Sequence, residues 1–324
     1  MKDRVLIVAS VASMIDQFNM PNIELLKEMG FDVDVACNFE EGNTCSLERI
    51  EELRVRLDTI GASAIQVDFC RSPFKLQNVT AYRQLLALMR DNQYKFVHCH
   101  SPIGGLCARI AAHKTGTKVI YTAHGFHFFN GNSAVKNFVF FHIEKMAAQW
   151  TDYLIVINKE DYEAALKMLP PERVCLMSGG VGLDLALYGS DVFFEADIDN
   201  VRKELGLTAR EVLFLMVAEF IPRKRHKDLI DALALTNDTE IHIAFAGTGI
   251  LFDEICAYAK QRGVASQTHF LGFRRDIPKL MMAVQATILP SAQEGLPRAV
   301  MESIVRGVPV IGSDIRGTRD LLIF

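Results

Sequence analysis

Two glutamates near the end of the chain have the residue type and spacing of ligand contacts. Glu294 and Glu302, with seven residues between them, lie in P-S-A-Q-E-G-L-P-R-A-V-M-E-S-I-V-R-G-V-P at 290–309. A strand pattern precedes this segment and Gly307 ends a helical pattern, which puts Glu294 in a loop and Glu302 about a turn and a half into a helix. This spacing argues against a close acid–base pair and favours two contacts to one elongated ligand. Taken singly, each residue also fits an ordinary loop or helix carboxylate.

The loop between these glutamates favours an anion. Pro297 suits the first turn of a helix, and the backbone N–H groups near Gly295 and Leu296 precede that turn. N–H groups at a helix start carry partial positive charge, so this loop is a candidate phosphate site. A turn containing Gly247 and Gly249 would let the backbone approach a nucleotide, although a G-x-G pattern alone has low specificity.

Short apolar runs that alternate with amphipathic stretches indicate the elements that position these residues. Strands separated by helices predict βαβ units, hence α/β domains with parallel sheets covered on both faces. Expected strands are 5–9, 32–36, 96–100, 118–122 and 153–157, then 213–218, 240–246, 268–271, 286–289 and 308–311. Expected helices are 20–29, 80–92, 104–114, 135–150, 227–235, 250–262, 276–283 and 297–306.

A weakly periodic stretch from about 178 to 200 separates the two sets of strands. We therefore expect two Rossmann-like, doubly wound domains, 1–180 and 181–324. Ligands bind beyond the carboxyl ends of strands in such sheets, which makes the cleft between the domains the expected site. The opening strand is not followed by G-x-G-x-x-G, so the first domain is not expected to bind a dinucleotide.

Composition narrows the class of protein. A length of 324 residues suits two domains, and a net charge of -4 gives no global field that would recruit nucleic acid. Seven scattered cysteines without a CxxC pair favour free thiols in a reducing cytoplasm. Because neither a signal peptide nor a long apolar run is found, we expect a cytoplasmic protein, with peripheral contact at the inner face of the plasma membrane left open.

Together with I-G-S-D-I-R-G-T-R-D at 311–320, the segment 290–309 resembles the E-x7-E region of family-four retaining glycosyltransferases with the GT-B fold. The resemblance implies that Glu294 contacts the hydroxyls of the donor sugar and that Glu302 holds the nucleotide ribose. It also implies that the loop amides between them meet the diphosphate. Relatives continue through another strand and closing helices, so the final C-terminal helices are expected to be missing here.

The segment A-E-F-I-P-R-K-R-H at 218–226 falls in the family's order. Lys224 aligns with the lysine that neutralises the leaving diphosphate, a task that requires a fixed cation. The family often has arginine where this chain has Glu219, so Arg223 or Arg225 is expected to supply a second positive charge. An ordinary solvated basic turn is the alternative interpretation.

Two further segments resemble the family. In F-L-G-F-R-R-D-I, backbone groups around Phe273 and Arg274 would hold a uracil-sized ring. In Y-T-A-H-G-F-H-F-F-N-G, which follows a strand, His124 aligns with the active-site histidine and would hydrogen-bond a sugar hydroxyl. His127 and Ser13 are further acceptor-side candidates, although a lone histidine is more often structural.

A metal site is not expected. His98 and His100 alternate on a strand and would share a face, but third and fourth ligands at suitable spacing are missing. D-x-D patterns at 32–34 and 197–199 are used by metal-dependent transferases of another fold, whereas GT-B enzymes generally need no such metal. We therefore expect no cofactor, with a UDP-sugar as the donor substrate.

The resemblance is strongest to bacterial enzymes of exopolysaccharide, capsule or lipid-linked glycan synthesis. It implies transfer of a hexose or N-acetylhexosamine from a UDP-sugar to a lipid-linked or growing glycan acceptor. A UDP-N-acetylglucosamine 2-epimerase-like enzyme and a truncated, inactive nucleotide-sugar binder are the alternatives. The segment F-V-F-F at 138–141 is expected to be a buried helix face, with contact to a lipid-linked acceptor or a membrane as the second interpretation.

Overall fold

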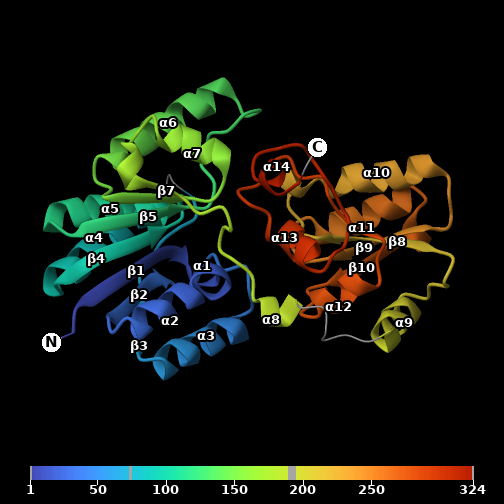
Figure 1. Cartoon of the computed structure of the whole chain (residues 1–324), viewed down its shortest axis with the longest axis horizontal. Coiled ribbons are helices and arrows are strands. Elements are labelled where there is room, and N and C mark those ends of the chain that lie inside the picture. Colours follow the sequence, from blue (N-terminus) through green and yellow to red (C-terminus); the bar gives the residue numbers. More distant parts are fainter. Residues whose placement is uncertain (1, 73–74, 189–194, 323–324) are drawn as a thin grey trace. The chain divides into compact units, whose positions relative to one another are not determined.

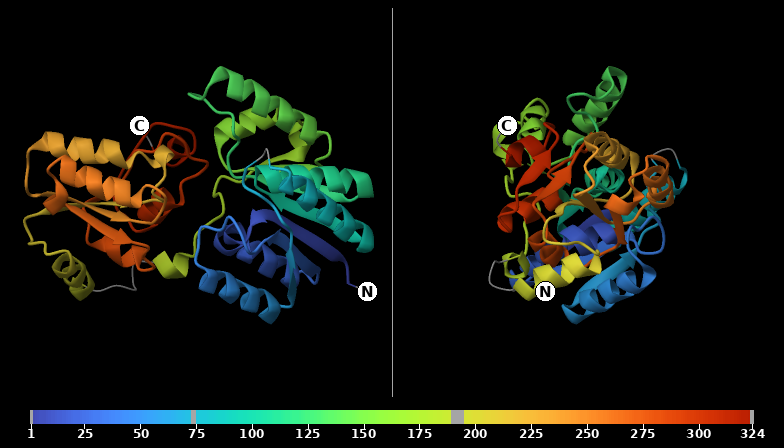
Figure 2. Two further views of the ribbon diagram at one scale, coloured as in Figure 1. Left: turned by 180° about the vertical axis from the view of Figure 1, so that it is seen from behind. Right: turned by 90° about the vertical axis from the view of Figure 1, so that its right-hand side faces the viewer.

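Two compact units, Met1–Val181 and Gly182–Phe324, make up the chain in the computed structural model (Figure 1). The structure describes residues 2–72, 75–188 and 195–322. Each unit is built on one parallel β-sheet with helices packed on both of its faces (Figure 2). This is the doubly wound α/β arrangement that the alternation of strands and helices predicts.

The sheet of the first unit has seven strands in the order β3-β2-β1-β4-β5-β6-β7, and all neighbouring pairs are parallel. The strands are β1 (Arg4–Val11), β2 (Asp32–Asn38), β3 (Ala62–Gln66), β4 (Tyr94–His100), β5 (Lys118–Ala123), β6 (Tyr153–Val156) and β7 (Val174–Leu176). Five of them lie where the sequence predicts strands. The edge strands β3 and β7 escaped prediction because they are short and only partly apolar.

Helices cover both faces of this sheet because the side chains of β1 alternate between two cores. Val5 and Ile7 pack on the side of α1 (Ala12–Phe18), α2 (Met20–Glu28) and α3 (Leu47–Thr59). Leu6 and Val8 pack on the side of α4 (Gln77–Asp91), α5 (Pro102–Thr115), α6 (Ala134–Ala148) and α7 (Lys159–Ala165). A short 3-10 turn, η1 (Pro171–Arg173), leads into β7.

The second unit repeats the plan with five parallel strands in the order β10-β9-β8-β11-β12. They are β8 (Val212–Val217), β9 (Ile241–Ala246), β10 (Thr268–Gly272), β11 (Ala286–Leu289) and β12 (Val310–Gly312), at the five predicted places. The helices are α8 (Leu185–Tyr188), α9 (Glu195–Glu204), α10 (His226–Thr236), α11 (Phe252–Gln261), α12 (Ile277–Met282), α13 (Arg298–Val305) and α14 (Thr318–Leu321), with 3-10 turns η3 (Pro222–Lys224) and η4 (Ala265–Gln267). The expected junction at 178–200 therefore contains α8 and the start of α9, while its residues 189–194 lie outside the described part of the chain.

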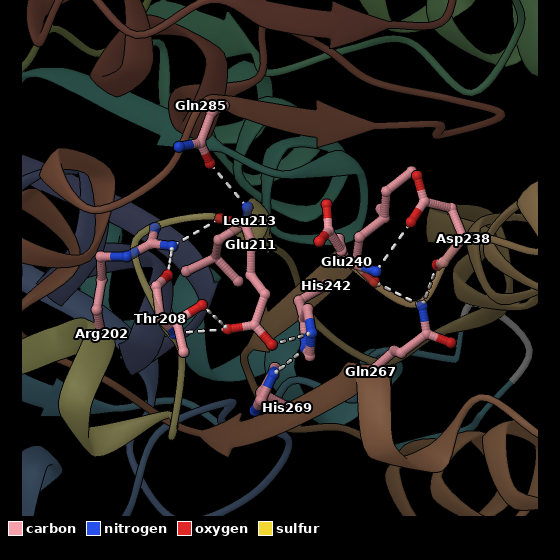
Figure 3. Close-up of polar contacts among 11 residues, drawn as sticks. Arg202, Thr208, Glu211, Leu213, Asp238, Glu240, His242, Gln267, His269 and Gln285 are labelled. Carbon is pink, nitrogen blue, oxygen red and sulfur yellow. Dashed lines mark hydrogen bonds and ion pairs between the residues drawn. The ribbon is translucent and has the colours of Figure 1, made fainter.

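Polar side chains at the amino ends of the strands in the second sheet bind one another (Figure 3). Arg202 Nη2 donates to the carbonyls of Thr208 and Glu211 at 2.6 Å each. His242 Nδ1 lies 3.0 Å from His269 Nε2, and its Nε2 lies 3.3 Å from a carboxylate oxygen of Glu211. These contacts stabilise the amino edge, whereas ligands of such sheets bind beyond the carboxyl ends of the strands.

Candidate active site

Each sheet has a point where the strand order reverses. In the first unit β1 lies between β2 and β4, and in the second unit β8 lies between β9 and β11. Loops that leave two strands at such a point diverge to opposite faces of the sheet and leave a crevice where ligands bind. The predicted site residues that follow β8 and β11 are therefore brought together by topology, although they are far apart in the sequence.

Lys224 and Glu294 form a buried ion pair at the reversal point of the second sheet. Lys224 ends the turn after β8, Glu294 lies in the loop after β11, and the Nζ–Oε1 distance is 2.5 Å across 70 positions of sequence. Their side chains are 13% and 7% exposed. Burial lowers the pKa of Lys224, and the Glu294 carboxylate opposes that change. Two residues that the sequence placed in separate motifs thus share one site.

Arg223 brings a second positive charge to this pair. Its Nη1 lies 3.6 Å from Glu294 Oε2 and donates to the carbonyl of Gln293 at 3.1 Å. Arg225 instead forms an ion pair with Asp228, one turn along the chain. The family often has an arginine where this chain has Glu219. Of the two arginines that could supply this charge instead, Arg223 is the one that faces Glu294.

The loop carrying Glu294 is held by the loop that follows β12. The buried Arg316 donates from Nε to the carbonyl of Glu294 at 3.1 Å. A Cβ added to Gly317, whose φ is 78°, would lie 2.1 Å from the carbonyl oxygen of Gly295 and 3.2 Å from Leu296 Cα. Only glycine fits there, so these contacts set the position of the predicted diphosphate loop. Sequence reasoning included this segment in the resemblance and missed the role of Arg316.

Glu302 occupies a different environment from Glu294. It is 6% exposed on α13, and Arg298 donates from Nε to its Oε1 at 3.0 Å. The phenol of Tyr188, at the end of α8, lies beside this carboxylate and also acts on its pKa. Burial raises the pKa of Glu302, and both partners oppose the rise. The two glutamates have separate protein partners, and their contact with different parts of one ligand stays a prediction.

The predicted glycine turn approaches protein backbone. A Cβ on Gly247 would lie 2.0 Å from the carbonyl oxygen of Ala218, and one on Gly249 would lie 2.6 Å from that of Phe220. The N–H of Phe220 donates to the carbonyl of Thr248 at 2.8 Å. These glycines therefore allow the turn after β8, which carries Lys224, to pack closely against the turn after β9. Approach of their backbone to a nucleotide remains a prediction.

Phe273 and Arg274 follow β10 at the same edge of the sheet. The Phe273 side chain is 71% exposed. The Arg274 guanidinium is bound by Asp276 at 2.7 Å and by Glu204 at 2.5 Å, so its side chain braces α9 and α12. Contact of this segment with a base would therefore use backbone groups and the exposed ring of Phe273.

Three histidines gather at the carboxyl edge of the first sheet. His100 Nδ1 lies 3.1 Å from His124 Nε2, and His98 Nε2 lies 2.8 Å from Thr122 Oγ1. The His98 and His100 rings are 4.3 Å apart between centroids. Burial lowers the pKa of all three, to about 4 for His98 and His124, so they are neutral at pH 7. Because Nε2 of His124 is hydrogen-bonded to His100, Nδ1 is the ring nitrogen of His124 that remains for another partner.

Ser13 and His127, the other acceptor-side candidates, are placed differently. Ser13 is 2% exposed, and its hydroxyl accepts from the N–H of Thr44 at 3.3 Å. His127 is exposed, its ring lies edge-on against Phe140 at 5.3 Å, and its carbonyl accepts from Asn132 at 3.1 Å. In this arrangement Ser13, in α1, holds the loop that follows β2, and His127 belongs to the turn before α6.

Ser10 and Ser101 mark the reversal point of the first sheet, and sequence reasoning missed them. Their hydroxyl oxygens are 2.7 Å apart, and Ser10 Oγ accepts from the N–H of Gly104 at 3.0 Å. Ser101 has a φ of 63°, a value that L side chains rarely adopt. Backbone strain of this kind is concentrated at functional sites. Ser101, in the sharp turn between β4 and α5, is therefore a further candidate site residue.

The two D-x-D patterns, which were not expected to bind a metal, make other contacts within the described ranges. Tyr94 donates to the buried Asp34 at 2.6 Å, and Lys279 lies 2.6 Å from Asp197. Over residues 2–72, 75–188 and 195–322, no cluster of three or more His, Cys, Asp or Glu side chains is arranged to bind a metal ion.

Helix α6 buries only part of its predicted apolar face. Phe140 and Phe141 pack against the core, whereas Phe138 is 66% exposed and Val139 is 46% exposed. The expectation of a buried helix face at 138–141 is therefore wrong for two of its four residues, because the F-V-F-F run extends around more than one side of the helix. Within the described part of the chain, none of the helices has the length and apolar character needed to span a bilayer.

Comparison with known proteins places this geometry in a family. Residues 23–185 match Glycosyltransferase Family 4, and residues 197–323 match Glycosyl transferases group 1. EpsD of Bacillus subtilis (strain 168), assigned to the glycosyltransferases, is 32% identical over 99% of this chain and 81% of its own length. An Escherichia coli UDP-Gal:alpha-D-GlcNAc-diphosphoundecaprenol alpha-1,3-galactosyltransferase is 27% identical over 96% of this chain and 78% of its own length.

Solved structures agree on the architecture. Anabaena Alr3699/HepE, crystallised in complex with UDP and glucose, superposes with a TM-score of 0.76 at 18% identity, covering 99% of this chain and 83% of that one. WaaG, a glycosyltransferase involved in lipopolysaccharide biosynthesis, superposes with a TM-score of 0.68 at 17% identity, covering 96% of this chain and 81% of that one. At these identities the likeness shows the fold, two Rossmann-like domains of the GT-B type. The chain belongs to the family 4 glycosyltransferases and is a hexosyltransferase with the GT-B fold.

Proposed function

We propose that this glycosyltransferase moves a hexose or N-acetylhexosamine from a UDP-sugar to a lipid-linked or growing glycan acceptor during cell-surface polysaccharide synthesis, with retention of anomeric configuration. Support comes from relatives: the E. coli galactosyltransferase is named for a UDP-Gal donor and a diphosphoundecaprenol-linked acceptor. A Campylobacter jejuni relative, 23% identical over 97% of this chain, is named for N-acetylgalactosaminyl transfer to a diphospho-undecaprenol-linked sugar.

The observation that carries the proposal is the buried Lys224–Glu294 pair with Arg223 beside it. A leaving nucleoside diphosphate develops negative charge at the oxygen that departs from the sugar. Preorganised cations at that point stabilise the transition state without reorganising during the reaction. We assign Lys224 and Arg223 to the diphosphate, Glu294 to the sugar hydroxyls and Glu302 to the ribose.

The proposed reaction takes place on one face of the sugar. The bond from the anomeric carbon to the diphosphate oxygen breaks, and its electron pair leaves with UDP. The acceptor hydroxyl forms the new bond on the same face, and its proton passes to the departing diphosphate oxygen. Anomeric configuration is thereby retained.

The protonation state of His124 supports this route. A histidine with a pKa of about 4 is a weak base at neutral pH and cannot take the acceptor proton efficiently. A neutral imidazole can still hydrogen-bond a hydroxyl of the transferred sugar. We therefore assign His124 to positioning of that sugar, and we propose that side-chain cations rather than a metal balance the diphosphate charge.

Exposed apolar residues on α6 support peripheral contact with a membrane. Val135 is 73% exposed, Phe138 66% and Met146 46%, and Lys136 and Lys145 are exposed on the same helix. Apolar side chains flanked by lysines suit the interface of an anionic bilayer, where a lipid-linked acceptor is held. The inner leaflet of the plasma membrane is the proposed surface.

The transfer proposal is tested by incubating the purified protein with UDP-glucose, UDP-galactose and their N-acetyl analogues, a polyprenyl-diphosphate sugar and EDTA. UDP release that depends on the acceptor, together with an α-linked product by NMR, is the expected result. Conversion of UDP-N-acetylglucosamine to its 2-epimer without an acceptor would favour the epimerase-like alternative. UDP binding without turnover of any donor would favour an inactive nucleotide-sugar binder.

Membrane contact is tested separately by flotation with vesicles that contain anionic phospholipid. Phe138→Asp should release most of the protein from the vesicles. Leu47→Asp, at a residue 74% exposed on α3, is the matched control and should still float. Equal flotation of both variants would contradict the assignment of α6 to the membrane.

A further inference from the structure

Tyr188 is a buried aromatic residue in a segment that looked like a linker. It ends the four-residue helix α8, which contacts α13, and it is only 4% exposed. Its carbonyl accepts a hydrogen bond from Arg306 Nη1, at the end of α13, at 3.2 Å. Its backbone is thus tied to the helix that carries Glu302.

The phenol of Tyr188 lies beside the Glu302 carboxylate, on a helix that packs against α13. Arg298 donates to Oε1 of the same carboxylate at 3.0 Å, and the neighbouring phenol lowers the pKa of that carboxylate, as a hydrogen-bond donor does. Burial and the neighbouring carboxylate raise the pKa of Tyr188, so the phenol keeps its proton and can donate. An ionised carboxylate has about four acceptor positions, so two donors leave acceptor capacity for further hydroxyls.

Resting on the proposed function, we infer that Tyr188 is a positioning residue for the donor nucleotide. Its hydroxyl fixes the rotamer of Glu302, together with Arg298, so that the remaining carboxylate lone pairs meet the vicinal hydroxyls of the ribose. A buried carboxylate without that partner would turn toward Arg298 alone and lose its alignment with the ribose. The preorganisation lies in unit 2 and needs no contribution from the acceptor.

The test compares UDP with 2′-deoxy-UDP by isothermal titration calorimetry on the full chain. The wild-type protein should prefer UDP by about tenfold, since a hydrogen bond to a charged group is lost with the 2′-hydroxyl. Tyr188→Phe keeps the ring and removes the hydroxyl. This variant should weaken UDP binding roughly five- to tenfold and keep the affinity for 2′-deoxy-UDP within about twofold of the wild-type value. Most of the preference for UDP would then be lost.

Tyr258→Phe is the matched control. Tyr258 lies in the same unit and donates to Asp231 at 2.7 Å, so the variant removes an equivalent tyrosine–carboxylate hydrogen bond at a different place. Its preference for UDP should equal that of the wild type. In a Glu302→Gln background, Tyr188→Phe should have no further effect on the preference, because the group that it positions is already altered.

Four outcomes would count against the inference. Equal weakening of both nucleotides by Tyr188→Phe, with a lowered melting temperature, would give Tyr188 a merely structural role. Tighter UDP binding in that variant would mean that the hydroxyl competes with the ribose. Wild-type protein that binds neither nucleotide would remove the proposed function itself. Wild-type protein that binds UDP, with a nucleotide preference that Tyr188→Phe leaves unchanged, would remove only the inference about Tyr188.

Discussion

The carboxyl edges of the two sheets differ in charge although the strands share one topology. In the first unit the edge holds His98, His100 and His124, which burial keeps neutral and which hydrogen-bond to one another or to Thr122. In the second unit the corresponding edge holds ion pairs, with Lys224 bound to Glu294 at 2.5 Å. One architecture thus presents neutral hydrogen-bonding groups on one sheet and fixed charges on the other.

This difference teaches how a transferase can divide its work. Fixed cations suit a diphosphate, whose charge grows during the reaction. Neutral imidazoles suit sugar and acceptor hydroxyls, which stay uncharged until their proton moves. The predictions below break one side of the comparison at a time.

Loss of the buried lysine should have the largest effect. Lys224→Met removes the fixed cation and leaves the carboxylate of Glu294 beside the half-exposed Arg223. We expect kcat to fall by roughly 10³-fold, as with loss of a preorganised transition-state donor. Lys227→Met, at an exposed lysine paired with Glu254, is the control and should retain activity in the same UDP-release assay. Comparable activity in both variants would remove Lys224 from the mechanism.

The contact between the two loops of the second unit comes next. Gly317→Ala would place a Cβ 2.1 Å from the carbonyl oxygen of Gly295, so the predicted diphosphate loop must shift. We expect kcat/KM to fall about 100-fold, since small misplacements of catalytic groups have effects of that size. Gly307→Ala has a similar φ of 67° with nothing near its Cβ, so it should lose about 1–2 kcal/mol of stability and keep the wild-type kcat/KM. If both variants keep the wild-type kcat/KM, the loop contact is not required.

Acid should destabilise the first unit through its histidines. The folded-state pKa values of His98 and His124 are about 4, below the unfolded value near 6.5, so the unfolded chain binds more protons between these limits. The stabilisation that comes from keeping these histidines neutral is fully present above about pH 6.5. Below that pH the free energy of unfolding falls by about 1.4 kcal/mol per pH unit for each such histidine, until the pH reaches about 4. Urea unfolding followed by Trp150, the single tryptophan, measures this in the first unit. An unfolding free energy equal at pH 7 and pH 5 would contradict the buried cluster.

The smallest effect is expected from the support of His124. His100→Phe keeps a ring in the core and removes the hydrogen bond to His124 Nε2. We expect kcat to fall about tenfold with KM for the donor unchanged, because one positioning hydrogen bond is lost and the second unit is untouched. His113→Phe, at an exposed histidine stacked on Trp150, is the control. A changed donor KM with an unchanged kcat would contradict this role.

Much of this molecule could be predicted from sequence because its signals are local. The five strands of the second sheet have apolar runs, and Glu294 and Glu302 lie in one continuous segment that resembles a known family. The strands β3 and β7 escaped because short, partly polar strands at sheet edges have little apolar periodicity.

The missed site residues act across long distances in sequence. Tyr188 lies beside Glu302 although its segment looks like a linker, and nothing near it in the sequence signals burial. Ser101 lies beside Ser10 only because β1 and β4 are neighbours in the sheet. The ion pair of Lys224 with Glu294 likewise depends on the reversal of strand order between β8 and β11. Such contacts follow from the fold, which one sequence without its structure does not display.

The division of labour between the two units is tested most directly by UDP affinity. Isothermal titration calorimetry of UDP is compared for wild type, Lys224→Met and His124→Asn, with folding checked by circular dichroism. The account predicts that Lys224→Met weakens UDP binding at least about tenfold, whereas the affinity of His124→Asn for UDP stays within about twofold of the wild-type value. Equal weakening in both variants, or weakening by His124→Asn alone, would contradict the assignment of the donor diphosphate to the second unit.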